Sequence, residues 1–166
     1  MNRQDFLTAR DFIYSDIQRE INSATTSQDF IGKLRLKSLI KTSGGGNFLA
    51  ALGLLSYTEF AGRLRFNKID RDGKSIASEN FNYFFDSLGG DYKNFRTKHN
   101  VYDIFRCGLS HEYFIKKNFT ICMLSDQDCC GVGLDTRGRY YFVVERYFSD
   151  FQKAFDLLEN ELSFDS

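Results

Sequence analysis

The longest apolar stretch of this chain runs Phe48-Leu-Ala-Ala-Leu-Gly-Leu-Leu-Ser-Tyr-Thr-Glu-Phe-Ala-Gly-Arg-Leu-Arg-Phe66. Apolar residues lie on nearly every side of a helix drawn through it, which predicts a central bundle helix or a helix at a dimer interface. Its small residues would let a neighbouring helix approach closely: Ala50, Ala51, Gly53, Ala61 and Gly62. One further face would carry Leu49, Leu52, Phe60 and Leu64. Glu59 is an isolated acid here, and we interpret it as a polar anchor rather than a catalytic group.

Amphipathic patterns before this stretch predict two more helices, over residues 3–22 and 27–41. Three glycines and Asn47 follow the second one. No Lys-Ser/Thr pair follows these glycines and no strand precedes them, so they match neither phosphate-loop fingerprint. A flexible helix connection is therefore expected, with Asn47 as the cap of the long helix.

Helical spacing continues after the long stretch. Ser78 is expected to cap a short helix that ends at Gly89-Gly90. Its inward residues would be Phe81, Phe84, Phe85 and Leu88. Another helix is expected to begin near Lys98, with four residues inward: Val101, Ile104, Phe105 and Leu109.

The pattern turns to β after Lys117, with candidate strands at 119–124, 129–134 and 139–144 and a hairpin turn at 135–138. A last amphipathic helix covers about 147–162. The expected fold is mainly α. A helical up-and-down bundle spans 3–117, a small antiparallel β meander 118–145, and a C-terminal helix 146–163, all in a single domain over 1–166.

Composition narrows the classes of function. The net charge is zero, whereas a domain with a broad grip on nucleic acid is usually basic, so any RNA contact must be local. The four cysteines form no C-x-x-C pair, and the two histidines are scattered, so neither a zinc site nor any other metal site is expected. The N-terminus lacks a signal-peptide core, and no apolar run reaches the ~20 residues of a membrane span. We therefore expect a cytoplasmic protein with free thiols.

The chemistry of the chain is concentrated in Arg106-Cys-Gly-Leu-Ser-His-Glu-Tyr113. Arg106 is a permanent cation, whereas His111 changes charge near neutral pH. The two suit chemistry on a phosphate, in which Arg neutralises the oxyanion and His moves the proton. In an unbroken α-helix, residues five apart point about 140° from each other. A tight pair therefore needs two copies around a dimer axis or a distortion at Gly108. Tyr113 lies almost two turns after Arg106 and shares its side.

The spelling R-x4-H-x-Y resembles the motif of HEPN-superfamily ribonucleases, helical toxins of prokaryotic toxin–antitoxin and defence systems. The resemblance implies a homodimer in which paired motif helices form one metal-independent endoribonuclease site with no cofactor. Carried over, Arg106 would stabilise charge on the scissile phosphate of an RNA substrate, and His111 would transfer protons. Tyr113 would be the residue to which a nucleotidyltransferase-like antitoxin adds AMP. Cys107, Ser110 and Glu112 would support the motif, and Lys116 and Lys117 would contact RNA.

The sequence leaves an alternative open, because Cys107 stands where active HEPN nucleases often carry a polar residue and a thiol is a weak hydrogen-bond partner. The chain would then be a non-catalytic helical module that binds a partner protein or a nucleotide. Arg106 would pair with Asp103 or Glu112, and His111 would be a hydrogen-bonded helix residue. Tyr113 would then belong to the core. His99, with no evident partner, is expected at the surface.

Overall fold

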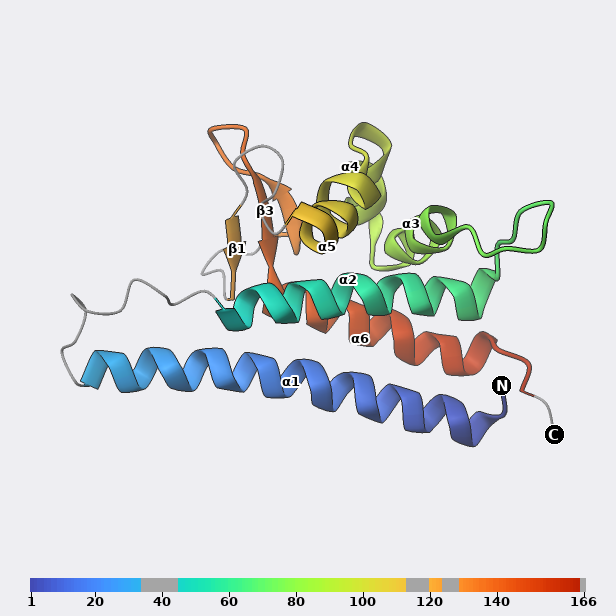
Figure 1. Cartoon of the computed structure of the whole chain (residues 1–166), viewed down its shortest axis with the longest axis horizontal. Helices are drawn as coiled ribbons and strands as arrows, with labels where there is room; N and C mark the ends of the chain where they lie inside the picture. Colours follow the sequence, from blue (N-terminus) through green and yellow to red (C-terminus); the bar gives the residue numbers. More distant parts are fainter. Residues whose placement is uncertain (34–44, 113–119, 124–128, 165–166) are drawn as a thin grey trace.

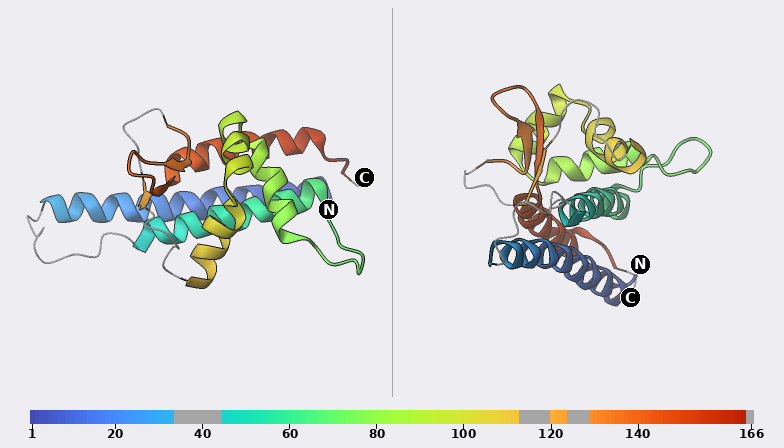
Figure 2. Two further views of the ribbon diagram at one scale, coloured as in Figure 1. Left: turned by 90° about the horizontal axis from the view of Figure 1, so that it is seen from above. Right: turned by 60° about the vertical axis from the view of Figure 1, so that its left-hand side comes forward.

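The computed structural model describes residues 1–33, 45–112, 120–123 and 129–164, without the side chains of 24–33, 45–47 and 111–112. Three long helices form its base: α1 (Arg3–Lys33), α2 (Gly45–Phe66) and α6 (Val144–Glu161). They lie side by side, and α1 runs opposite to α2 and α6 (Figure 1). On the far side of α2 and α6 from α1 lie the shorter elements (Figure 2). These are α3 (Ala77–Ser87), α4 (Gly90–Lys98), the π-helix η1 (Tyr102–Cys107), α5 (Gly108–Glu112) and a small sheet.

The expected fold class is confirmed, because the chain is mainly helical with a small three-stranded sheet and a final helix. The strands are β1 (Thr120–Cys122), β2 (Val132–Leu134) and β3 (Tyr140–Val143). Their order is β1-β3-β2, with β1 parallel and β2 antiparallel to β3. The expected antiparallel meander is therefore wrong for β1, whereas the β2–β3 hairpin and its turn are confirmed.

The bounds of several helices differ from the sequence prediction. α1 continues to Lys33 without the break expected after residue 22. Residues 22–27 contain Ser, Thr and Asn, which only weakly disfavour a helix, and neither Pro nor Gly. α2 already begins at Gly45, so Asn47 lies inside it and is not its cap. The cap of α3 is Ile76, and Ser78 lies inside the helix. The rest of the predicted 27–41 helix lies outside the described residues.

The core between the layers is rich in aromatic rings, as the 18 Phe and nine Tyr of the chain require. Phe6 of α1 stacks on Phe155 of α6 with ring centroids 5.2 Å apart, and Phe84 of α3 meets Phe151 of α6 edge-on at 5.6 Å. The inward residues predicted for α3 are all buried: Phe81, Phe84, Phe85 and Leu88. Phe148, Phe151, Phe155 and Leu158 of α6 are buried as well, whereas Leu162, just after α6, is only half-buried. Buried Thr58 and Tyr147 join α2 to α6 through hydroxyls 2.8 Å apart.

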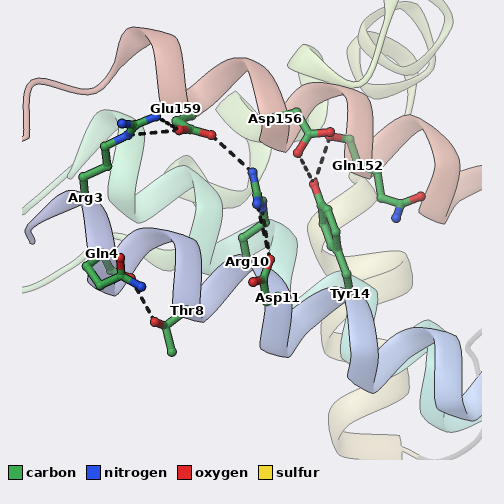
Figure 3. Close-up of polar contacts among 9 residues, drawn as sticks. All are labelled: Arg3, Gln4, Thr8, Arg10, Asp11, Tyr14, Gln152, Asp156 and Glu159. Atoms are coloured by element: carbon green, nitrogen blue, oxygen red, sulfur yellow. Dashed lines mark hydrogen bonds and ion pairs between the residues drawn. The ribbon is translucent and has the colours of Figure 1, made fainter.

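Polar side chains of α1 and α6 bind each other along the outer edge of the base (Figure 3). Glu159 of α6 accepts hydrogen bonds from Arg3 and Arg10 of α1. One turn earlier in α6, Asp156 accepts a 2.8 Å hydrogen bond from the Tyr14 hydroxyl. Burial and the neighbouring Asp156 raise the pKa of Tyr14 above its usual value, so the phenol keeps its proton and remains a donor. None of the described helices is long and apolar enough to cross a lipid bilayer.

The close helix packing predicted from the small residues of α2 is found at Gly62. A Cβ atom added at Gly62 would lie 1.8 Å from the backbone carbonyl oxygen of Asn80 in α3. Ala50, Ala51 and Ala61 of the same helix are fully buried. Leu49 is 55% exposed, so the larger residues of α2 do not all form an inward face. The helix packs through its small residues, and this brings α3 onto it.

Gly62→Ala should therefore destabilise the protein. Relief of the overlap requires the α2 and α3 backbones to separate, and overpacking of this kind costs about 1–3 kcal/mol or more. Gly90→Ala is the matched control, because a Cβ there meets nothing within 4 Å. Chemical denaturation should show a large loss of the free energy of unfolding for Gly62→Ala and no loss for Gly90→Ala. Equal effects would contradict the close approach of α3.

Candidate functional site

The motif begins in a π-helix, η1, which continues into α5. The side chain of Asn100 caps its start by accepting a hydrogen bond from the Asp103 N–H, and the Gly108 N–H donates to the carbonyls of Asp103 and Phe105. The three buried apolar side chains of this segment recur every four positions: Val101, Phe105 and Leu109. Four is longer than the 3.6-residue α turn, so a wider turn keeps all three facing the core.

A tight Arg106–His111 pair within one copy would need a distortion of the helix at Gly108. The π turn is such a distortion, and it ends at Gly108. Only its last two residues, Arg106 and Cys107, fall within the step from Arg106 to His111, however, and Gly108–Glu112 are α-helical. The turn therefore does little to reduce the offset of about 140° that α geometry gives for five residues. Inserted π turns occur often at functional sites, since they re-aim side chains on a helix.

Arg106 leaves η1 toward α2, where its guanidinium binds Glu59. The Nε atom donates a 3.1 Å hydrogen bond to the Glu59 carboxylate, and the two side chains are 23% and 28% exposed. A second guanidinium nitrogen, Nη1, donates to the Ser110 hydroxyl, which in turn donates to the Arg106 carbonyl at 2.6 Å. The guanidinium is thus fixed on two sides at the edge of the fold. Within the described ranges, its Nη2 atom has no acceptor.

Tyr102 and Cys107 of η1 are half-buried in the surroundings of this pair. Burial, followed by the negative charge of Glu59, raises the pKa of the Tyr102 phenol, whereas Arg106 acts in the opposite direction. Tyr102 therefore stays neutral at physiological pH. It also meets Phe81 of α3 edge-on with ring centroids 5.4 Å apart, which holds η1 against α3.

The structure places only part of the predicted site. Arg106 and Ser110 are brought together, and the half-buried Cys107 follows Arg106 in η1. His111 and Glu112 lie in α5, but their side chains are outside the described residues, as are Tyr113, Lys116 and Lys117 altogether. Among the described residues, Arg106 pairs with Glu59 and not with Asp103, one of the two partners considered from the sequence. The side chain of Glu112, the other partner, lies outside the described residues.

Glu59 is the residue that the sequence did not connect to the motif, and the ion pair with Arg106 gives this isolated acid a polar contact. The available signal was a lone acid in an apolar helix, which needs a cation nearby when it is partly buried. The sequence predicted His99 at the surface without a partner, and this prediction is wrong. This residue is half-buried, with its ring 4.4 Å from that of Phe95 and its Nδ1 3.2 Å from the Tyr140 hydroxyl.

The described residues contain no group of three or more His, Cys, Asp or Glu side chains placed to hold a metal ion. Comparison with protein-family models, curated proteins and solved structures finds no match to this chain.

Glu59→Gln should lower the free energy of unfolding by about 1 kcal/mol, because it leaves the half-buried Arg106 without a counter-charge. Glu20→Gln is the control. Glu20 also faces an arginine, Arg19, but at 3.7 Å and with that arginine 68% exposed, so its loss should cost only a few tenths of a kcal/mol. Urea denaturation of both variants measures the difference. Equal losses would show that the Glu59–Arg106 pair does not anchor η1.

Proposed function

We propose that this chain is a metal-independent endoribonuclease of the HEPN type, acting as a cytoplasmic homodimer. The observation that carries the proposal is the fixed guanidinium of Arg106 at the start of R-x4-H-x-Y. Glu59 and Ser110 hold it in place through Nε and Nη1. The Nη2 donors remain for a phosphate oxygen, to which Arg binds strongly through paired N–H groups.

In the proposed reaction the ribose 2′-hydroxyl attacks the adjacent phosphorus. Its oxygen forms a bond to phosphorus, its proton passes to a histidine, and the bond to the 5′-oxygen of the next nucleotide breaks. A histidine returns a proton to that leaving oxygen. With one His111 from each protomer, one can act as base and the other as acid. Arg106 stabilises the additional charge on the phosphate oxygens. The products are a 2′,3′-cyclic phosphate and a 5′-hydroxyl.

Glu59 would have a positioning role in this scheme. A guanidinium already held in one orientation loses little side-chain freedom when the phosphate arrives. Its neutralisation by a carboxylate also weakens unspecific attraction to RNA, which agrees with a chain of zero net charge. Local contacts would then come from Lys116 and Lys117, which follow the motif in the sequence.

The second candidate is a non-catalytic helical module that binds a partner protein or a nucleotide. The Glu59–Arg106 pair favours it, because an ion pair between η1 and α2 gives Arg106 a structural role that needs no substrate. Cys107 at the position after the motif arginine favours it too, since a thiol is a weak hydrogen-bond partner.

Purified protein should cleave single-stranded RNA in the presence of EDTA. His111→Ala should lower the rate by about 10²–10⁴-fold, the usual contribution of a positioned proton-transfer group. Arg106→Lys should also cleave more slowly, because an ammonium lacks the planar arrangement of N–H groups by which a guanidinium binds two phosphate oxygens. The controls His99→Gln and Arg63→Lys alter residues of the same types outside the motif and should leave the rate unchanged.

Cleavage that persists in both motif variants would assign the activity to another site or to a contaminant. If neither the wild type nor Cys107→Asn cleaves any RNA tested, the binding module becomes the better interpretation. Circular dichroism of each variant checks that the fold is retained, since Arg106 also anchors η1 through Glu59.

We propose further that a nucleotidyltransferase-like antitoxin regulates the chain by modifying Tyr113. The phenol oxygen would attack the α-phosphorus of ATP, pyrophosphate would leave, and the phenol proton would be released. The attached AMP adds bulk and negative charge where the RNA phosphate must bind. Intact-mass analysis after incubation with such an enzyme and ATP should show one added AMP. Tyr113→Phe should prevent the addition, and Tyr102→Phe should not. Modification at other residues with Tyr113 unchanged would contradict the proposal.

A further inference from the structure

An open groove of about 580 Å³ lies between α1 and α2. Apolar side chains from both helices line much of it, among them Ala9 and Ile13 of α1 and Phe60 of α2. Its volume falls within the range of about 300–1,000 Å³ that is typical of pockets that bind organic groups. The groove could therefore take up a large apolar side chain.

Phe12 stands at the edge of this groove and is 64% exposed, the largest value among the large apolar residues of the described chain. It lies on the side of α1 opposite to the core residues Phe6, Ile17 and Ile21. The base of the fold therefore presents a protruding aromatic ring directly beside an apolar hollow. Exposed apolar features of this kind mark protein interaction sites.

The face of α1 that carries Phe12 is complementary to itself. Positions 5, 8, 9, 12, 16 and 19 follow the i, i+3, i+4, i+7, i+11, i+14 spacing of one helix face. If two copies of α1 cross antiparallel at Phe12, residues equally far from it oppose each other. Asp5, seven residues before Phe12, then faces Arg19, seven residues after it. Small Ala9 faces Ser15, which permits close approach.

The charges on this face are available for such a contact. Within the described part of the chain, the Asp5 carboxylate has no ion-pair partner. Arg19 is 68% exposed, and its ion pairs among the described residues are with acids of its own helix, Asp16 and Glu20. Exchange of these local contacts for the opposing Asp5 costs little, because exposed pairs within a helix contribute only a few tenths of a kcal/mol. The antiparallel arrangement forms the Asp5–Arg19 pair twice.

We infer that the α1/α2 groove is the interface for a second copy of this chain. The two α1 helices lie antiparallel, Phe12 of each copy enters the groove of the other, and two Asp5–Arg19 pairs flank them. A second copy fits better than an unrelated protein, because a two-fold interface requires one patch to carry both members of every contact. This face carries both the Phe12 ring and the groove that would receive it, and both Asp5 and Arg19.

The groove and the motif share α2. Ser56 lines the groove and lies one turn before Glu59 on α2, and Glu59 binds Arg106. The motif segment itself lies on the far side of α2 from α1 (Figure 2). The contribution of two motifs to one site rests on the proposed ribonuclease function, whereas the dimer itself rests only on the groove, Phe12 and the charges.

Sedimentation equilibrium of the full chain tests the inference. The wild type should be a dimer at micromolar concentration, and Phe12→Asp should raise the dissociation constant on the order of 1,000-fold. Loss of one central aromatic anchor costs about 30-fold, and a two-fold interface loses two. Leu157→Asp on α6 is the matched control, because Leu157 is 59% exposed but lies outside the groove and should leave the dimer intact.

A charge exchange tests the register. Asp5→Lys and Arg19→Glu should each weaken the dimer, and the double variant should recover most of the lost affinity. A wild type that stays monomeric at hundreds of micromolar, or a dimer that survives Phe12→Asp, would overturn the inference. A monomeric Phe12→Asp variant that still cleaves RNA would support this interface and contradict only the two-copy site. A dimer without any cleavage would support the interface while the ribonuclease proposal fails.

Discussion

The approach of α3 to α2 at Gly62 is the constraint on which the rest of the fold depends. No side chain separates the two backbones there, since even a Cβ atom would overlap the Asn80 carbonyl. The buried Asn80 side chain then fixes the connection between the helices, because it accepts from the Lys68 N–H at 2.8 Å and donates to the Lys68 carbonyl at 3.1 Å. With α3 in place, Phe81 supports Tyr102, and the motif segment is held above α2.

The Glu59–Arg106 pair joins this packing to the chemistry of the chain. It accounts for a lone acid in an apolar helix and for a cation within a π turn, and it fixes both at the surface. A structural role and a catalytic role use the same geometry here. A guanidinium that anchors η1 also presents its remaining N–H groups in a defined direction, as phosphate recognition requires. The two proposed functions therefore differ in what binds Arg106, not in how it is held.

Local patterns in the sequence predicted the features that neighbouring residues determine, such as the buried face of a helix and the position of a hairpin turn. The spacing of Phe81, Phe84 and Phe85 placed the buried face of α3, and Gly138, with φ of +72°, occupies the predicted hairpin turn. The parallel pairing of β1 with β3 was missed, because strand order depends on packing between distant segments. The same reason hid the partner of Arg106, since Glu59 lies 47 residues away in the sequence. Of the predicted site, the structure brings Ser110, which was expected to support the motif, into contact with Arg106. The roles assigned to the site residues stay predictions.

Native-state hydrogen exchange tests the central position of α2 most directly. If the contact at Gly62 supports the whole fold, the amides of residues 50–62 in α2 and of Phe81–Phe85 in α3 should exchange only through global unfolding. Their opening free energies should equal the free energy of unfolding from denaturation. The amides of α4, which packs mainly on α3, should open at lower free energy. Exchange of the α2 amides through local openings, well below the global value, would contradict the account.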